Sequence, residues 1–176
     1  MHAAKRKGRL TLTIQAGERR VFRRVLEAII RNYKQPPEGL PSKVAQVWYS
    51  TAGCRSAQMS AEQTGEWIDE LRAIRKSRLR LLQRFVRELG AAGKGSSELR
   101  MSTDQAAVFM TSLNDHRLFL AARHNIGEAE MNWPFYASAA PLTPARRKAL
   151  FEIGELAFAI EILLGVLNPE AVSWAD

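Results

Sequence analysis

The sequence predicts a mainly α-helical protein with a small antiparallel sheet. Three observations lead to this class: long amphipathic segments that begin at capping residues, two short segments that alternate apolar and polar residues, and an internal repeat within the 176-residue chain. We expect four long helices in two pseudo-symmetric strand–helix–helix halves, joined by a two-stranded antiparallel sheet.

The first half of the chain contains a strand signal followed at once by a helix signal. Residues Leu10–Ile14 read Leu-Thr-Leu-Thr-Ile, which alternates as a half-buried strand does. A helix begins near Gly17 and ends before Pro36, because proline cannot continue the backbone hydrogen bonding of a helix. The loop 35–59 is expected to carry a short helix near 42–49.

Two capping boxes begin further helices. In Ser60 with Gln63, and again in Ser102 with Gln105, a hydroxyl and an amide can satisfy the free amides of a first turn. The expected elements are a helix over 60–89 (about 45 Å long at 1.5 Å per residue), a strand over 99–102, a helix to 125 and a last helix over 143–167.

An internal repeat relates these segments. When the chain is shifted by 87 residues, Leu12 aligns with Leu99, Phe22 with Phe109, and Leu26 with Leu113. Short isolated strands are unstable. We therefore expect Leu10–Ile14 to pair with Leu99–Ser102 and to relate the two halves by pseudo-twofold symmetry.

Composition is that of one globular domain. We place this domain at residues 10–168, between a basic flexible tail at 1–9 and a C-terminal tail at 169–176. Cys54 is the only cysteine, so no intrachain disulfide can form, and a reducing cytoplasm is expected. The basic N-terminus lacks the apolar segment of a signal peptide, and the apolar stretch 156–167 is too short to span a bilayer.

The stretch 112–127 places polar side chains within an otherwise apolar helix. These residues are Asn114, Asp115, His116, Arg117 and Arg123. Buried polar groups need partners, because desolvating them alone is costly. We expect a polar network in which Arg117 or Arg123 binds Glu155 or Glu161 of the last helix, and a role in interaction stays open for the same residues.

The same stretch carries a family resemblance. Leu113-Asn114-Asp115, then Arg117-Leu118, then Arg123 and Ile126-Gly127 resemble a family of small bacterial helical proteins of unknown function. His116 departs from the usual Leu, and Ala121-Ala122 from the usual Gly-Thr. In actinobacteria these proteins are often encoded beside the ClpS-type adaptor of the Clp protease, so the resemblance implies a Clp component as a protein partner.

Charge is unevenly distributed along the chain. Residues 1–100 hold 21 Lys and Arg against 9 Asp and Glu, whereas residues 101–176 hold 5 against 9. Five cations form a stripe at helical spacing within 60–89 and are candidates for binding phosphates: Arg72, Lys76, Arg80, Arg84 and Arg87. The competing interpretation of the same stripe is a solvated helix face.

No catalytic or phosphate-loop motif is present in the sequence, and His116 and His124 are too far apart along a helix to share a metal ion. We therefore expect no catalytic residue, no metal, no cofactor and no membrane partner. The expected function is that of a non-catalytic, cytoplasmic protein-interaction or regulatory module, with a homodimer among the options. The alternative is a nucleic-acid-binding protein that uses the stripe and the basic tail.

Overall fold

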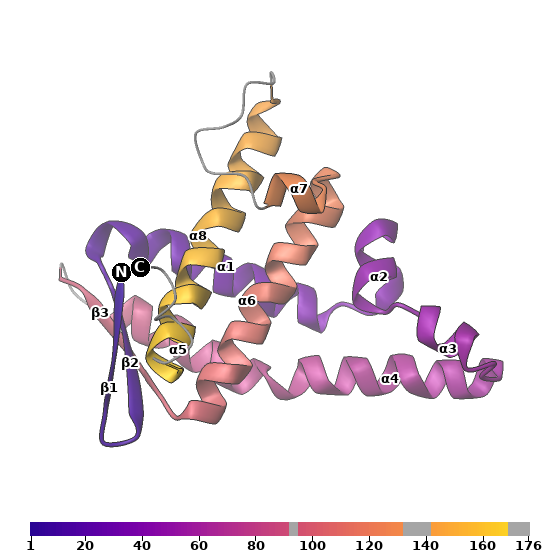
Figure 1. Ribbon diagram of the computed structural model, residues 1–176, viewed down its shortest axis with the longest axis horizontal. Helices are drawn as coiled ribbons and strands as arrows, with labels where there is room; N and C mark the ends of the chain where they lie inside the picture. The colour runs from indigo at the N-terminus through magenta and orange to yellow at the C-terminus, as the bar shows by residue number, and fades with distance from the viewer. Residues whose placement is uncertain (92–94, 132–141, 169–176) are drawn as a thin grey trace.

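The computed structural model describes residues 1–91, 95–131 and 142–168. Within them the protein is mainly helical, with one small sheet (Figure 1). In chain order the elements are β1 (His2–Arg6), β2 (Arg9–Ile14), α1 (Ala16–Lys34), a 3-10 turn (Pro37–Gly39), α2 (Ser42–Trp48), α3 (Ala52–Ser56), α4 (Ala61–Ser77), α5 (Leu79–Ala91), β3 (Ser97–Met101), α6 (Thr103–His124), α7 (Glu128–Met131) and α8 (Pro144–Leu167).

The sheet confirms the predicted pairing between strands that lie far apart in the sequence. β2 and β3 are antiparallel, with Leu12 opposite Leu99. Leu10, Leu12 and Ile14 are fully buried, because alternate residues of a strand share one face. The twofold relation between the two halves, and the set of four long helices, stay predictions.

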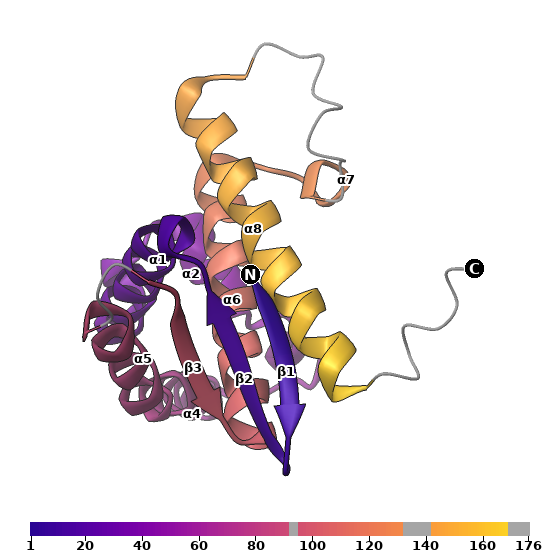
Figure 2. The ribbon, with the colours of Figure 1, turned by 90° about the vertical axis from the view of Figure 1, so that its left-hand side faces the viewer.

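The prediction of a flexible tail over residues 1–9 is wrong, and so is the prediction of only two strands. His2–Arg6 form β1, which pairs with β2 as the edge of a three-stranded sheet in the order β1–β2–β3 (Figure 2). Lys7 and Gly8 join the two strands with positive φ angles of 48° and 75°, as a two-residue hairpin turn requires. The segment lacks apolar alternation, so its conformation comes from pairing with β2. Residues 169–176 lie outside the described residues.

The helix beginnings agree with the capping residues. Ser60 accepts a hydrogen bond from the backbone of Gln63, and Ser102 does so from Gln105, in two complete capping boxes. α6 ends at Asn125, which adopts the left-handed conformation with φ of 53°. The short helix expected near 42–49 is confirmed as α2.

The single helix expected over 60–89 is wrong. It is divided into α4 and α5 at Arg78, where the backbone amide donates to the carbonyl of Arg75 at 3.2 Å. This bond to the third residue back, rather than the fourth, tightens the turn locally. No proline or glycine in the sequence marks this division. The side chain of Arg78 instead bonds to Asp115 of α6.

The core lies between the sheet and the long helices. α6 and α8 pack side by side, α5 lies against β3, and α8 lies against β1 (Figure 2). In Figure 1, α4 extends away from the sheet together with α2 and α3. No helix in the described part of the chain is long and apolar enough to cross a membrane.

Candidate functional site

Asp115 is the centre of a buried polar cluster that joins α1, α2, the end of α4 and α6. Its Oδ2 accepts hydrogen bonds from Tyr33 Oη at 2.7 Å and from Arg78 Nη1 at 3.0 Å. Arg75 Nε lies 3.6 Å from the same oxygen, and Trp48 Nε1 donates to the Asp115 carbonyl at 3.1 Å. We call these five residues the Asp115 cluster. Because the Asp115 side chain is only 13% exposed, its charge needs these partners.

Aromatic rings enclose the cluster on the side of α2. The Arg75 guanidinium lies 5.0 Å from the ring centroids of both Trp48 and Tyr49, within the range of a cation–π contact. Trp48 also packs edge-on against Tyr33, with centroids 5.6 Å apart. Burial raises the pKa of the Tyr33 phenol well above its ordinary value of 10.0, and the neighbouring Asp115 charge raises it further. Tyr33 is therefore a neutral donor to Asp115.

His116 forms a second buried polar contact, with α8. Its Nε2 lies 3.0 Å from Glu152 Oε1, and its ring stacks on Phe119. Burial opposes ionisation of Glu152, but the hydrogen bond and charge of His116, with Arg24 and Lys148 nearby, hold the pKa of this carboxyl below its ordinary value. A general acid or base must come within about 3 Å of its substrate. His116 is only 2% exposed, whereas the Glu152 side chain keeps 15% exposure, so solvent reaches this pair only on the side of the carboxylate.

The other polar residues of the motif point elsewhere. Asn114 is exposed and accepts a hydrogen bond from Arg117 at 3.4 Å, and Arg123 lies over the ring of Phe119 at 5.9 Å. Burial lowers the pKa of Arg117, and Glu161 partly opposes this.

The sequence-based pairing with α8 is therefore only partly right. α6 does pack against α8, but within the described residues no ion pair joins Arg117 or Arg123 to Glu155 or Glu161. The carboxylate that binds the motif is Glu152, and its partner is His116. Helical spacing leaves all three carboxylates of α8 as candidates, and only the packing of α8 on α6 selects Glu152.

The partners of Asp115 come from segments that sequence reasoning did not connect to it. Tyr33 lies in the helix predicted to end before Pro36, and Trp48 lies in the short helix predicted near 42–49. Arg75 and Arg78 lie next to the predicted cation stripe without belonging to it. The sequence carries only an indirect signal for these contacts. A carboxylate such as Asp115 within an apolar helix needs cationic partners, but the chain has too many lysines and arginines for the sequence to select them.

The predicted phosphate-binding stripe is divided by the break at Arg78. Arg72 pairs with Asp69 at 3.0 Å, whereas Lys76, Arg80 and Arg87 are exposed. Arg84 is taken up in a structural contact, because its Nη2 donates to the carbonyl of Arg100 at 3.0 Å and its Nε pairs with Glu88. The five cations therefore do not form one continuous free surface.

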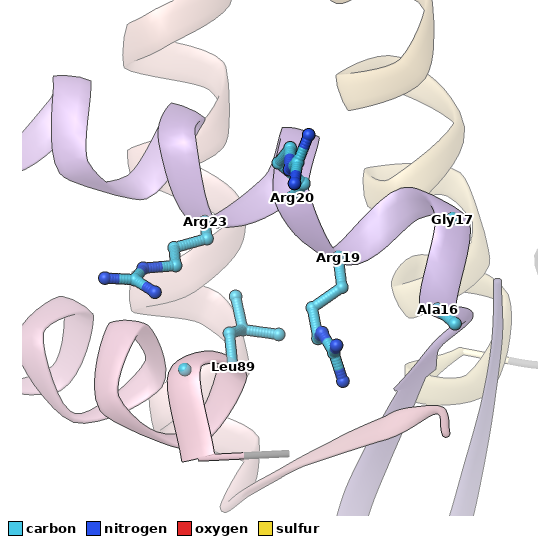
Figure 3. A pocket seen from close by; sticks show the side chains of 7 residues that line it. Ala16, Gly17, Arg19, Arg20, Arg23 and Leu89 are labelled. Atoms are coloured by element: carbon cyan, nitrogen blue, oxygen red, sulfur yellow. The ribbon is translucent and has the colours of Figure 1, made fainter. Parts of the chain in front are cut away.

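A different group of arginines surrounds a pocket of about 470 Å³ between the start of α1 and the end of α5. We call it the arginine pocket. Arg19 and Arg23 point from α1 toward the end of α5, on either side of Leu89, while Arg20 points away from Leu89 (Figure 3). The lining residues are Ala16, Gly17, Arg19, Arg20, Arg23, Leu89 and Gly90, with no carboxylate among them.

α4 presents the second unusual surface. Trp67 and Ile74, seven residues apart on this helix, are 39% and 43% exposed. Glu66 and Glu70 lie beside them at helical spacing and are also exposed. We call these four residues the α4 strip. Large apolar side chains aligned on one exposed helix face are typical of binding surfaces.

The fold and these contacts define a mainly helical protein in which the motif helix α6 is held by buried polar contacts to its neighbours. The chain belongs to the family described as a domain of unknown function, DUF2017, whose model matches residues 60–167. This range runs from the capping residue of α4 to the end of α8 and leaves Tyr33, Trp48 and most of the arginine pocket outside the match. No curated protein and no solved structure matches the chain.

Proposed function

We propose that the protein is a non-catalytic binding module, and that it docks an amphipathic helix with basic edges on the α4 strip. The observation that carries this proposal is the alignment of exposed Trp67 and Ile74 with two exposed carboxylates along one face of α4.

Helical geometry places the four residues together. Trp67, Glu70 and Ile74 are spaced by three and four residues, so their side chains adjoin along one face, and Glu66 lies one turn from Glu70. Leu71, half-buried, forms the base of this strip. An apolar partner side chain would therefore meet Trp67 and Ile74, the kind of aromatic anchor that dominates binding energy in protein interfaces.

The charges of the strip determine the partner. Within the described residues, Glu66 and Glu70 take part in no ion pair, so their charges are available to an incoming cation. The rest of the protein carries a net positive charge, which makes this acidic strip distinct from its surroundings. A partner with lysine or arginine beside its apolar face fits, and an acidic one does not.

The strip is also held in place before binding. Trp67 Nε1 donates to the carbonyl of Ser50 at 3.3 Å, which limits the orientation of the indole. The nearby end of α4 is anchored through Arg75 to Asp115. A preordered surface loses less conformational entropy on association.

The test uses a synthetic amphipathic helical peptide with leucines on one face and lysines along its edges. A second peptide carries glutamates in place of the lysines. Fluorescence anisotropy should show the lysine peptide binding the wild-type protein and the glutamate peptide failing to bind. Trp67→Ala should weaken binding about 30-fold, the loss of a hot-spot residue. Phe158→Ala, an exposed aromatic on α8, is the matched control and should bind as wild type.

Charge substitutions make the test independent of Trp67. Glu66→Lys with Glu70→Lys should reverse the preference toward the glutamate peptide, whereas Glu128→Lys, at an exposed position on α7, should not. Equal binding of both peptides, or unchanged binding by Trp67→Ala and by the double variant Glu66→Lys with Glu70→Lys, would exclude this docking site. The family resemblance adds a natural partner for the same variants, a component of the Clp protease.

A further inference from the structure

The arginine pocket concentrates positive charge that the fold does not neutralise. Arg19 donates one hydrogen bond, to the carbonyl of Gly95 at 3.1 Å, and keeps its other guanidinium donors. Arg20 is exposed and makes no ion pair among the described residues. Arg23 pairs with Glu27 at 3.0 Å, but this pair is on the surface, 50% and 39% exposed, where ion pairs exchange readily.

Glu18, the other carboxylate of α1 near the pocket, is bonded elsewhere, and its Oε1 pairs with the N-terminal ammonium of Met1 at 3.0 Å. Glu18 accepts a hydrogen bond from the backbone amide of Gln15 at 2.9 Å, as part of the cap of α1, and does not line the pocket. Ala16 and Gly17, the first residues of α1, form one wall, so the positive end of the helix faces the same space as the arginines. The charges at this place are therefore almost all of one sign.

The shape of the pocket keeps two guanidinium groups apart and accessible. Arg19 and Arg23 flank Leu89, and Gly90 leaves room for Arg23: a Cβ at this position would stand 3.4 Å from Arg23 Nη1. Each of these planar groups carries five N–H donors that can bind the oxygens of a tetrahedral anion.

We infer that the arginine pocket binds a phosphate group. It is separate from the α4 strip and from the stripe on α4 and α5. The phosphate comes either from a small phosphorylated molecule or from the backbone of a nucleic acid. The competing explanation is structural. α5 ends beside the pocket, and the arginines would then only stabilise the last backbone carbonyls of this helix.

The experiment is an NMR titration of the whole chain with inorganic phosphate at constant ionic strength, with chloride as the counter-titrant. The backbone amide of Gly17 and the Nε–H groups of Arg19 and Arg23 should shift with phosphate and not with chloride. Arg19→Gln with Arg23→Gln should weaken phosphate binding at least about tenfold, since two charge-assisted contacts are lost. Arg31→Gln with Lys34→Gln removes the same charge from the far end of α1 and should leave binding unchanged.

A variant that keeps the net charge distinguishes the effect of the pocket's shape from that of its charge. Gly90→Leu fills the space next to Arg23 without altering net charge, and it should also weaken phosphate binding. Circular dichroism of each variant confirms that it folds. Two results would leave the pocket with only the structural role. One is that phosphate shifts these NMR resonances no more than chloride does. The other is that Arg19→Gln with Arg23→Gln leaves phosphate affinity unchanged.

Further arms of the experiment distinguish the sources of the phosphate. An adenosine monophosphate titration represents the small molecule, and a single-stranded oligonucleotide represents the nucleic acid. Two results together identify a nucleic-acid backbone as the source of the phosphate. The oligonucleotide binds more tightly than the monophosphate, and Arg19→Gln with Arg23→Gln lowers the salt dependence of oligonucleotide affinity by about two released counterions. If Arg80→Gln with Arg87→Gln abolishes oligonucleotide binding while the pocket variant does not, the pocket is not the nucleic-acid site.

Discussion

Arg78 Nη1 donates to Asp115 Oδ2 at 3.0 Å, and this contact joins the break between α4 and α5 to the middle of α6. The same oxygen accepts from Tyr33 of α1. One carboxylate thus bonds both to the residue at the break between α4 and α5 and to a side chain of α1. Asp115 also contacts Arg75, in the last turn of α4. The α4 strip lies on the same helix.

Replacing Asp115 should therefore destabilise the whole fold. Asp115→Ala strands two guanidinium groups and a buried phenol, and we expect a loss of about 3–5 kcal/mol in the free energy of unfolding. Urea denaturation followed by circular dichroism measures it. Asn114→Ala, at the exposed neighbouring position, should change stability by less than about 0.5 kcal/mol. Similar midpoints for the two variants would show that the Asp115 cluster is not a structural centre.

Tyr33 should make the stability of the protein sensitive to alkaline pH. Its pKa is raised in the folded state, so the unfolded chain loses the phenolic proton more easily. The stabilising effect is then fully present below the ordinary pKa of 10.0 and is lost as the pH rises above it. Unfolding experiments across this range should show a steeper loss for wild type than for Tyr33→Phe. A phenolate absorbance titration in which Tyr33 ionises at its ordinary pKa in the folded protein would contradict this.

Glu152 should have the opposite effect, in acid. Its folded pKa lies below the ordinary 4.5, so its contribution is present above that pH and disappears as the pH falls through the folded value. Glu152→Gln should cost about 1–3 kcal/mol at neutral pH, and the difference from wild type should shrink as the pH falls below the ordinary pKa of 4.5. Glu155→Gln, half-buried on the same helix, is the control. A difference that does not vary with pH would mean that the ionised carboxylate is not what His116 binds.

Arg84 and Arg80 should contribute differently to the stability of the protein, although both belong to the predicted stripe. Arg84→Gln removes the donor to the carbonyl of Arg100 and should destabilise the protein by about 1 kcal/mol. Arg80→Gln, at an exposed position, should change stability by less than about 0.5 kcal/mol. Thermal unfolding of the two single variants makes the comparison. Equal effects would restore the interpretation of the stripe as one uniform solvated face.

Capping and periodicity in the sequence determined much of the secondary structure. Ser60 with Gln63 and Ser102 with Gln105 mark helix beginnings because their side chains bond to backbone amides only a few residues away. The alternation in Leu10–Ile14 marks a strand, and its internal match with Leu99 led to the correct partner strand. Such signals are local, or repeat at a fixed offset, and can be read without knowing the packing.

The tertiary structure alone decided the rest. β1 is a strand because it pairs with the edge of β2, and the helix over 60–89 divides at Arg78. The motif of α6 binds α8 through His116 and Glu152, where the sequence predicted a contact of Arg117 or Arg123 with Glu155 or Glu161. The physical reason is common to all three. A polar group leaving water takes whichever partner the packing brings within hydrogen-bond distance, and helical spacing alone presents several equivalent partners. The sequence by itself determined that the motif of α6 needed a polar network, and only the packing of five helices selected its members.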